Sequence, residues 1–178
     1  MKRTMLILAC LACVTCAAHH PPLDTMERVD LHRYQGRWYE IARLPNWFQK
    51  ECTRSMATYT LLKSGKVGVR NQCDTAGGLT KISRGTASVV DRETNAKLEV
   101  VFDNWFSRLF PFFTKGNYWI LYLDADYTRV IVGTPDRKYL WIMARTPNLD
   151  DAVYQDLVTR CTALGFDTTG LVRAPGTP

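Results

Sequence analysis

The residue types that most often carry chemistry are sparse in this chain, and their spacing does not favour catalysis. The three histidines, His19, His20 and His32, all precede the first predicted strand. A catalytic nucleophile needs a base beside it, and no histidine falls where a pocket is expected. The sequence contains no Gly-x-Ser-x-Gly turn, no phosphate-binding loop and no metal-ligand pair at useful spacing. We therefore predict no enzyme, no metal site and no cofactor.

The cysteines favour a disulfide. Three of the six lie in the N-terminal apolar segment, and the others are Cys52, Cys73 and Cys161. Cys161 continues a helical apolar stripe and is interpreted as a small buried residue. Cys52 and Cys73 flank one predicted hairpin, so we predict that they pair. Their expected register is offset by a few residues, so the chain before the strand must fold back. Pairing of Cys73 with Cys161 is the alternative.

The N-terminus has the pattern of an export signal. Lys2 and Arg3 precede an apolar stretch that ends in small residues, which predicts a signal peptide over 1–18 and a polar lead-in over 19–29. Cleavage after Ala18 fits the small-x-small rule. Lipoprotein processing is the alternative, with Cys16 or Cys13 as the lipid-bearing residue. Either route predicts export to the cell envelope, as a periplasmic protein or one anchored by lipid to the outer membrane.

Composition and charge indicate one folded domain. The 178 residues are 46% hydrophobic and 22% charged, as in globular proteins. Loss of the predicted signal would lower the net charge from +6 to +4, because it carries Lys2 and Arg3. The remaining basic residues are scattered and do not alternate with stacking aromatics, so no nucleic-acid partner is expected. Attraction to anionic lipid headgroups is compatible with this charge.

The elements that would position any site are short strands separated by turns. Eight apolar runs follow one another with turn residues between them, and the first hairpin loop places Gly65 where a positive φ is expected. The predicted strands are 37–44, 55–62, 66–73, 81–91, 97–104, 117–124, 129–134 and 138–145. Only afterwards does the period change to that of a helix, within 147–167.

That helix is amphipathic. Asn148 is a candidate N-cap and Gly165 a natural end. Its apolar stripe comprises Val153, Leu157, Cys161 and Leu164.

Eight successive antiparallel strands predict an all-β fold. Short connections favour an eight-stranded up-and-down β-barrel over a sandwich with a solid core. The barrel and one C-terminal α-helix packed on its side would occupy 30–173. A barrel of eight strands is just wide enough to hold one small ligand.

Three motifs in order carry a resemblance to a known family. The run "GRWYEIARL" with Gly36 and Trp38, the run "DADYT" with Asp126 and Tyr127, and Arg145 in "LWIMARTP" resemble the signatures of the lipocalins. The sequences of the strands are similar to those of the bacterial outer-membrane branch of this family, which resembles apolipoprotein D. This resemblance implies binding, storage or transport of fatty acids or lysophospholipids for envelope maintenance, with a membrane anchor and a homodimer in some members. A lumen-cysteine isomerase using Cys73 and an interaction module without a ligand are the alternatives.

Trp38 and Arg145 are predicted to be structural. A barrel open at one end must be sealed at the other, and Trp38 supplies a large flat plug. Arg145 on the last strand can stack over its face, and such a cation–π contact contributes about 1–2 kcal/mol when desolvated.

Alternation along the strands predicts which side chains face the interior. The small residues Ala57, Gly85 and Ala87 are expected to leave volume open. Glu40 and the tyrosine hydroxyls are expected to supply the polar contacts, although Glu40 is equally compatible with a structural role. The predicted lumen residues are Glu40, Ala42, Ala57, Tyr59, Val69, Val100, Phe102, Tyr118, Ile120, Tyr139, Trp141 and Met143.

Two loops at the end opposite Trp38 are rich in aromatic residues. Large apolar groups in exposed loops usually mark a partner, a membrane or a ligand lid. The predicted rim, or membrane-contact, residues are Trp47, Phe48, Trp105, Phe106, Phe110, Phe112 and Phe113. We predict that this rim touches a bilayer or a second copy of the chain.

Overall fold

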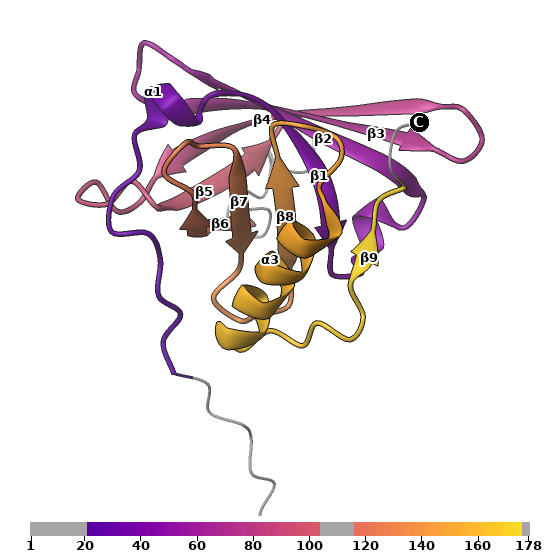
Figure 1. Ribbon diagram of the computed structural model, residues 1–178. Coiled ribbons are helices and arrows are strands. Elements are labelled where there is room, and N and C mark those ends of the chain that lie inside the picture. The colour runs from indigo at the N-terminus through magenta and orange to yellow at the C-terminus, as the bar shows by residue number, and fades with distance from the viewer. Residues whose placement is uncertain (1–20, 104–115, 176–178) are drawn as a thin grey trace, which may run out of the picture.

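The computed structural model describes residues 21–103 and 116–175, which form a closed antiparallel barrel with one long helix outside it (Figure 1). The predicted signal peptide and the second aromatic loop lie outside the described residues. The barrel strands are β1 (Gly36–Arg43), β2 (Cys52–Leu61), β3 (Val67–Thr75), β4 (Thr80–Val89), β5 (Lys97–Phe102), β6 (Gly116–Leu123), β7 (Arg129–Gly133) and β8 (Leu140–Ala144). The predicted eight-stranded barrel is confirmed.

Closure is made by β1, which pairs with β8 on one side and with β2 on the other. The β1–β2 register runs from Gly36 opposite Tyr59 to Tyr39 opposite Met56. All other neighbours among β1 to β8 are consecutive in the chain, as an up-and-down meander requires. Gly65 in the β2–β3 turn has φ +75°, so the expected positive φ is also found.

Three short elements were not predicted. A single-turn helix, α1 (Leu31–Tyr34), precedes β1, and Asp30 caps its start by accepting from the His32 amide at 2.8 Å. A 3-10 turn, η1 (Trp47–Gln49), follows β1, and β9 (Val172–Arg173) adds to the edge of β1. These pieces are too short to show a period in the sequence.

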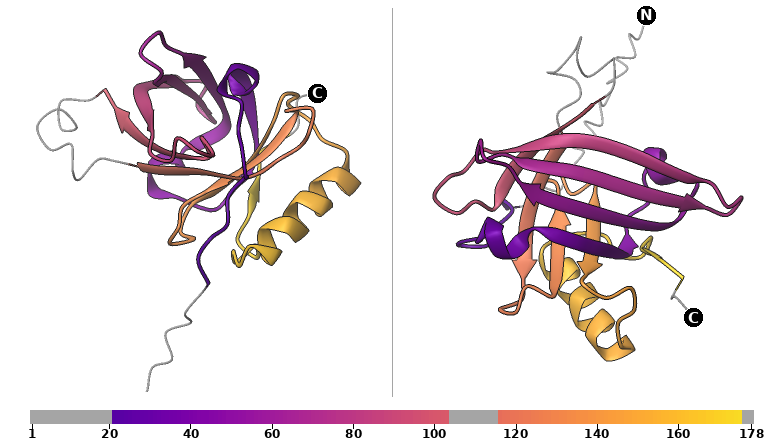
Figure 2. Two further views of the ribbon diagram at one scale, coloured as in Figure 1. Left: turned by 90° about the vertical axis from the view of Figure 1, so that its left-hand side faces the viewer. Right: turned by 90° about the horizontal axis from the view of Figure 1, so that it is seen from above.

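The long helix α3 (Asp151–Ala163) packs on the outside of the barrel wall (Figure 2). Its buried face consists of Tyr154, Leu157 and Cys161, which join an outer apolar cluster with β7 and β8 residues such as Ile131 and Ile142. The helix begins later than predicted, because its N-cap is Asp150 rather than Asn148. In the described part of the chain, no helix is long and apolar enough to cross a membrane.

A second apolar cluster fills the barrel side of the same wall. It includes Trp38, Tyr59, Val69, Val100 and Ile120. Strands under α3 are therefore apolar on both faces, one face in each cluster, as in sheets covered on two sides.

Two β-bulges change which residues face inward. The β1–β8 register shifts between Glu40 and Ala42, so that Ile41 and Ala42 both join the outer cluster. The predicted lumen position of Ala42 is therefore wrong, because the extra residue of a bulge breaks the alternation of the strand. A similar shift between Ile120 and Tyr122 on β6 turns Tyr122 outward.

Gly85 is needed for close approach of strands rather than for open volume. A Cβ at this position would lie 2.5 Å from the carbonyl oxygen of Val101 and 3.1 Å from Cα of Phe102. A side chain there would push β5 away from β4. The expectation that Gly85 enlarges the interior is thus replaced by a packing requirement.

The predicted disulfide between Cys52 and Cys73 is present, with their Cα atoms 5.3 Å apart. Ser55 is the register partner of Cys73, and a shift between Cys52 and Arg54 provides the required fold-back. Cys161 is free and lies on the buried face of α3, as expected.

The closed end of the barrel is built around Trp38, which is fully buried. Its Nε1 donates to the Tyr34 carbonyl at 2.8 Å, and the Arg145 guanidinium lies 3.9 Å from its ring centroid. Arg145 also donates to five backbone carbonyls, those of Arg33, Tyr34, Gln35, Arg37 and Tyr127. The arginine thus fastens β8 to α1, to β1 and to the β6–β7 turn.

That turn depends on a residue that the sequence motif does not single out. Asp124 accepts from the amides of Thr128 and Arg129 and pairs with the Arg129 side chain at 2.9 Å. Asp126, the expected signature residue, is exposed. Tyr127 has φ +60°, and its hydroxyl accepts from the Asp30 amide.

Replacing Arg145 with Lys is expected to lower the free energy of unfolding by about 2–3 kcal/mol. An ammonium cannot reach five carbonyls or stack as a plane, and charged hydrogen bonds contribute about 1.5–3 kcal/mol each. Urea unfolding followed by circular dichroism measures the change. Arg37→Lys at an exposed position is the control and should shift stability by under about 0.5 kcal/mol. Equal effects of the two changes would contradict this account.

Candidate ligand-binding site

The barrel interior is the candidate site, because its wall is apolar on every strand. Nine of the predicted lumen residues belong to the inner cluster or pack against it: Ala57, Tyr59, Val69, Val100, Ile120 and Met143, with Phe102, Tyr118 and Trp141 partly buried. Val67, Ala87 and Leu98 extend the wall toward α1. The structure therefore brings most of the predicted set onto one surface.

Strand β7 supplies wall residues that the prediction missed. Val130 and Val132 are fully buried in the inner cluster, whereas Ile131 between them belongs to the outer one. The run is apolar at successive positions because α3 covers its outer face. No alternation marks which residues face inward, so the sequence held no signal for this choice.

Three tyrosines meet near the closed end. The hydroxyls of Tyr34 and Tyr118 are 2.6 Å apart, and the Tyr59 ring lies against both rings, with centroids 5.6 and 5.7 Å away. Burial raises the pKa of all three phenols above the usual value, and the Tyr118 hydrogen bond opposes the rise for Tyr34 and Tyr59. The closed end of the barrel is thus lined by neutral hydroxyl groups as well as by aliphatic side chains.

A polar network occupies the opposite end of β1. Glu40 and Arg43 form a buried ion pair with Nη1–Oε1 at 2.6 Å, and Arg43 also donates to the carbonyls of Gln49 and Cys52. Gln49 donates to Glu40 at 2.7 Å and to Ser55 at 3.2 Å. Glu40 therefore has protein partners on both oxygens, and its structural role is the one these contacts favour.

Gln49 also connects η1 to the barrel wall at the rim. Its Oε1 accepts from Trp141 Nε1 at 2.9 Å and from Asn46 at 2.8 Å, which fixes η1 against β8. Arg43 and Gln49 were not predicted as site residues. Arg43 lies two residues before a proline and Gln49 lies in a loop, and neither position indicates a buried polar network. The bulge in β1, which brings them together, is not visible in the sequence.

Aromatic side chains surround this end of the barrel. Phe48 packs against Tyr139 and Trp141 with centroids 5.6 and 6.4 Å away, and Tyr139 stacks on Trp141. Phe48 is 49% exposed and Trp47 is 81% exposed. The first aromatic loop thus presents two large side chains to solvent at the rim. The other predicted rim residues, Trp105, Phe106, Phe110, Phe112 and Phe113, lie outside the described residues.

One buried polar atom on the inner face has no partner. The side-chain oxygen of Asn71 on β3 is buried and makes no hydrogen bond. Nε of Arg43 is also buried without a hydrogen-bond partner, although both Nη atoms of that guanidinium donate hydrogen bonds. Buried polar groups are nearly always satisfied, so an unpartnered acceptor on this face is an exception that calls for a physical reason.

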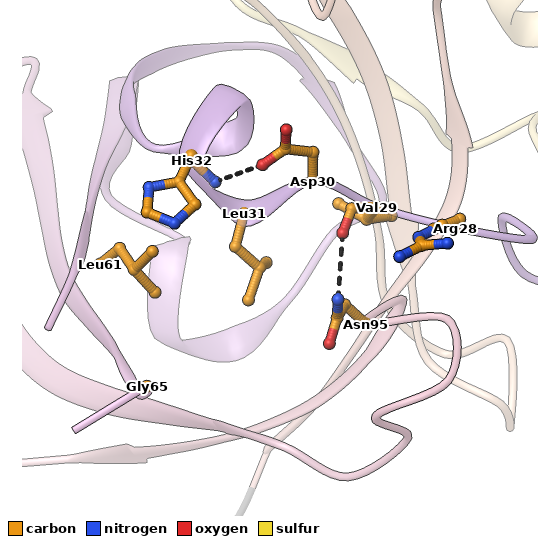
Figure 3. Close-up of a pocket in the computed structure, with 8 residues that line it drawn as sticks. All are labelled: Arg28, Val29, Asp30, Leu31, His32, Leu61, Gly65 and Asn95. Atoms are coloured by element: carbon orange, nitrogen blue, oxygen red, sulfur yellow. Dashed lines mark hydrogen bonds between the residues drawn. The ribbon is translucent and has the colours of Figure 1, made fainter. Parts of the chain in front are cut away.

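A pocket of about 390 Å³ lies near the closed end, beside α1 (Figure 3). It is lined by Arg28, Val29, Asp30, Leu31, His32, Leu61, Gly65 and Asn95. Within its lining, Asn95 donates to the Val29 carbonyl at 3.2 Å. Over residues 21–103 and 116–175, no group of three His, Cys, Asp or Glu side chains could hold a metal ion.

A closed antiparallel barrel with an arginine-backed tryptophan plug, an apolar interior and one outer helix defines the class of protein. A family model described as a lipocalin-like domain matches residues 29–176. The chain therefore belongs to the lipocalin family.

The relatives found with known names agree with this assignment. The outer membrane lipoprotein Blc of Escherichia coli K12 is 35% identical over 168 residues, which cover 92% of this chain and 90% of the relative. The temperature-induced lipocalin-1 of Arabidopsis thaliana is 34% identical, with 86% and 82% covered. Apolipoprotein D of Macaca fascicularis is also 34% identical, with 83% and 76% covered.

Solved structures show the same fold. Insecticyanin from the tobacco hornworm Manduca sexta aligns with a TM-score of 0.67 at 17% identity, over 88% of this chain and 86% of that one. At this identity the likeness concerns the fold alone.

The tyrosine cluster predicts an alkaline titration that depends on folding. A raised pKa means that folding favours the protonated phenol, so each tyrosine contributes stability below about pH 10 that is lost as the pH rises further. Absorbance at 295 nm at about pH 11 should show at least three fewer phenolates in the folded protein than in urea. Tyr118→Phe should reduce that difference. Ionisation of every tyrosine near pH 10 in the folded state would contradict the cluster.

Proposed function

We propose that this protein binds a single-chain lipid, a fatty acid or a lysophospholipid, inside the barrel and stores or carries it in the cell envelope. The observation that carries the proposal is the continuous apolar inner wall, sealed at one end by Trp38 and Arg145. A mostly apolar, concave surface with a few polar groups is the usual form of a small-molecule site.

The energetics suit reversible carriage. Ten methylenes buried against this wall gain about 8 kcal/mol in total, at about 0.8 kcal/mol each. Association and ordering of the ligand cost several kcal/mol, which offsets part of this gain. We expect a dissociation constant in the micromolar range, which allows both uptake and release.

The envelope location is supported by relatives. Blc proteins from several bacteria, at 28–35% identity, are named outer membrane lipoproteins. The predicted N-terminal signal agrees with such a location. Attachment of lipid at Cys16 or Cys13 and assembly into a homodimer stay predictions.

Thiol chemistry in the lumen is not supported by the cysteines that the structure describes. Cys73, the candidate for an isomerase-type role, is bonded to Cys52. Cys161 lies in the outer cluster, and burial raises the pKa of its thiol to about 12. A thiolate is the reactive form, so binding is favoured over this kind of catalysis.

Filling the interior tests the proposal. Ala57→Phe and Ala87→Phe each place a ring in the lumen, since both alanines are buried in the inner cluster. We expect each to weaken binding of oleate at least tenfold, measured by displacement of a lipophilic fluorescent dye. Thiol reagents should leave binding unchanged.

The controls are Thr58→Phe and Ser88→Phe, which carry the same ring on the neighbouring outward positions. These should bind oleate as the unmodified protein does. Overpacking itself destabilises a fold by about 1–3 kcal/mol. Urea unfolding therefore shows whether a variant loses binding because its interior is filled or because it no longer folds. Oleate binding that survives both inward changes would contradict a site in the barrel.

We further propose that the rim meets the membrane surface during lipid exchange. Trp47 and Phe48 stand exposed at the end of the barrel opposite the plug. An indole combines an apolar body with a polar N–H and so favours the lipid interface, and the phenyl ring adds apolar surface beside it. A ligand could then pass between bilayer and lumen with little exposure to water.

Replacing Trp47 with Ser should reduce association with liposomes several-fold in a flotation assay. Val90→Ser removes another exposed apolar side chain, 59% exposed in the β4–β5 turn at the plugged end, and is the matched control. Oleate affinity in solution should not change in either variant. Equal loss of liposome association in both variants would contradict a specific role of the rim.

A further inference from the structure

Asn71 is a polar residue set among apolar ones on the inner face of β3. Val67 and Val69 belong to the inner cluster, and Asn71 is two residues beyond Val69. The register with β4 is unbroken from Val67 opposite Ala87 to Asp74 opposite Thr80. Without a bulge, alternation places the Asn71 side chain on the same face as the two valines.

The surroundings of this amide leave it without a protein partner. Its register neighbours are Ala57 on β2 and Ser83 on β4, and its oxygen accepts no hydrogen bond although it is buried. Among the nearby polar groups at the rim, Ser55 and Glu40 both accept from Gln49, and neither donates to the Asn71 oxygen. Ala57 has no side chain beyond Cβ, so the space beside the amide is not taken from that strand.

The position of Asn71 is part-way down the cup. It lies one side-chain step, about 7 Å, nearer the rim than the row of Tyr59 and Val69, and one step deeper than the row of Ser55 and Cys73. A lipid whose charged head stays at the rim would pass this amide with its chain rather than with its head.

We propose that Asn71 is a specificity-determining residue that selects lipid chains bearing a hydroxyl group. The hydroxyl donates to the vacant amide oxygen, and the remainder of the chain contacts the apolar wall. An unsubstituted chain leaves the oxygen buried and unsatisfied, which disfavours it. This inference rests on the proposed lumen site and adds the class of chain that the site prefers.

The chemistry of an amide makes the choice of group testable. A carbonyl oxygen accepts only from a donor, so a hydroxyl on the chain is favoured and a ketone at the same carbon is not. If the amide were turned by half a rotation, its NH₂ group would face the chain and a ketone would be accepted as well. A hydroxyl and a ketone oxygen are similar in size, so comparing the two chains distinguishes an effect of hydrogen bonding from an effect of ligand volume.

The experiment measures displacement of a lipophilic dye by stearate, by stearates hydroxylated at carbon 2, 10 or 12, and by the ketone analogues at carbons 10 and 12. We expect at least one hydroxystearate to bind about three- to tenfold more tightly than stearate, which is the range that one net hydrogen bond supplies. The matching ketone should gain nothing.

Asn71→Leu keeps the branched shape and removes the acceptor. It should abolish the preference and bind stearate at least as tightly as the unmodified protein. Gln72→Leu, on the outer face of the same strand, is the matched control and should retain the preference. If Asn71→Leu does not fold, Asn71→Ala provides the same comparison.

Two results would overturn the inference while leaving the proposed function intact. One is equal affinity of the unmodified protein for stearate and for every hydroxystearate. The other is a preference that persists after Asn71→Leu, or one shared by the ketone. Failure of all these chains to displace the dye would instead overturn the lumen site itself.

Discussion

The stacking of Arg145 on Trp38 is the contact on which the rest of the structure depends. A closed barrel has two ends, and a plug of side chains alone would leave the backbone carbonyls of the entering chain without donors. Arg145 satisfies five of these carbonyls while covering the indole. The plug is therefore held by hydrogen bonds and by stacking together, and it closes the end of the barrel next to the inner apolar cluster.

Polar groups are distributed unevenly along the barrel. Neutral tyrosine hydroxyls gather near the plug, and the Glu40–Arg43–Gln49 network lies toward the rim, with an aliphatic wall between them. The network also fixes η1, which carries the exposed aromatics, to the barrel. The buried ion pair and the rim are thus connected through the single side chain of Gln49.

Much of this arrangement could be predicted from the sequence, and the failures have physical causes. Turn residues between short apolar runs gave the strand order, and the pattern in β5 gave its inner face. Ala42 was assigned to the wrong face because a bulge is invisible in an alternating pattern. Val130 and Val132 were missed because α3 makes both faces of β7 apolar. Asp124, not Asp126, holds its turn through contacts that spacing alone does not distinguish.

The central claim is that a hydrocarbon chain occupies the space above Trp38. Nuclear magnetic resonance with stearate carrying a nitroxide near its methyl end tests this most directly. The account predicts strong broadening of methyl signals from Val69, Val100 and Ile120, with signals from Leu157 on the buried face of α3 affected far less. Broadening confined to the outer helix, or none at saturating ligand, would contradict a lipid site inside the barrel.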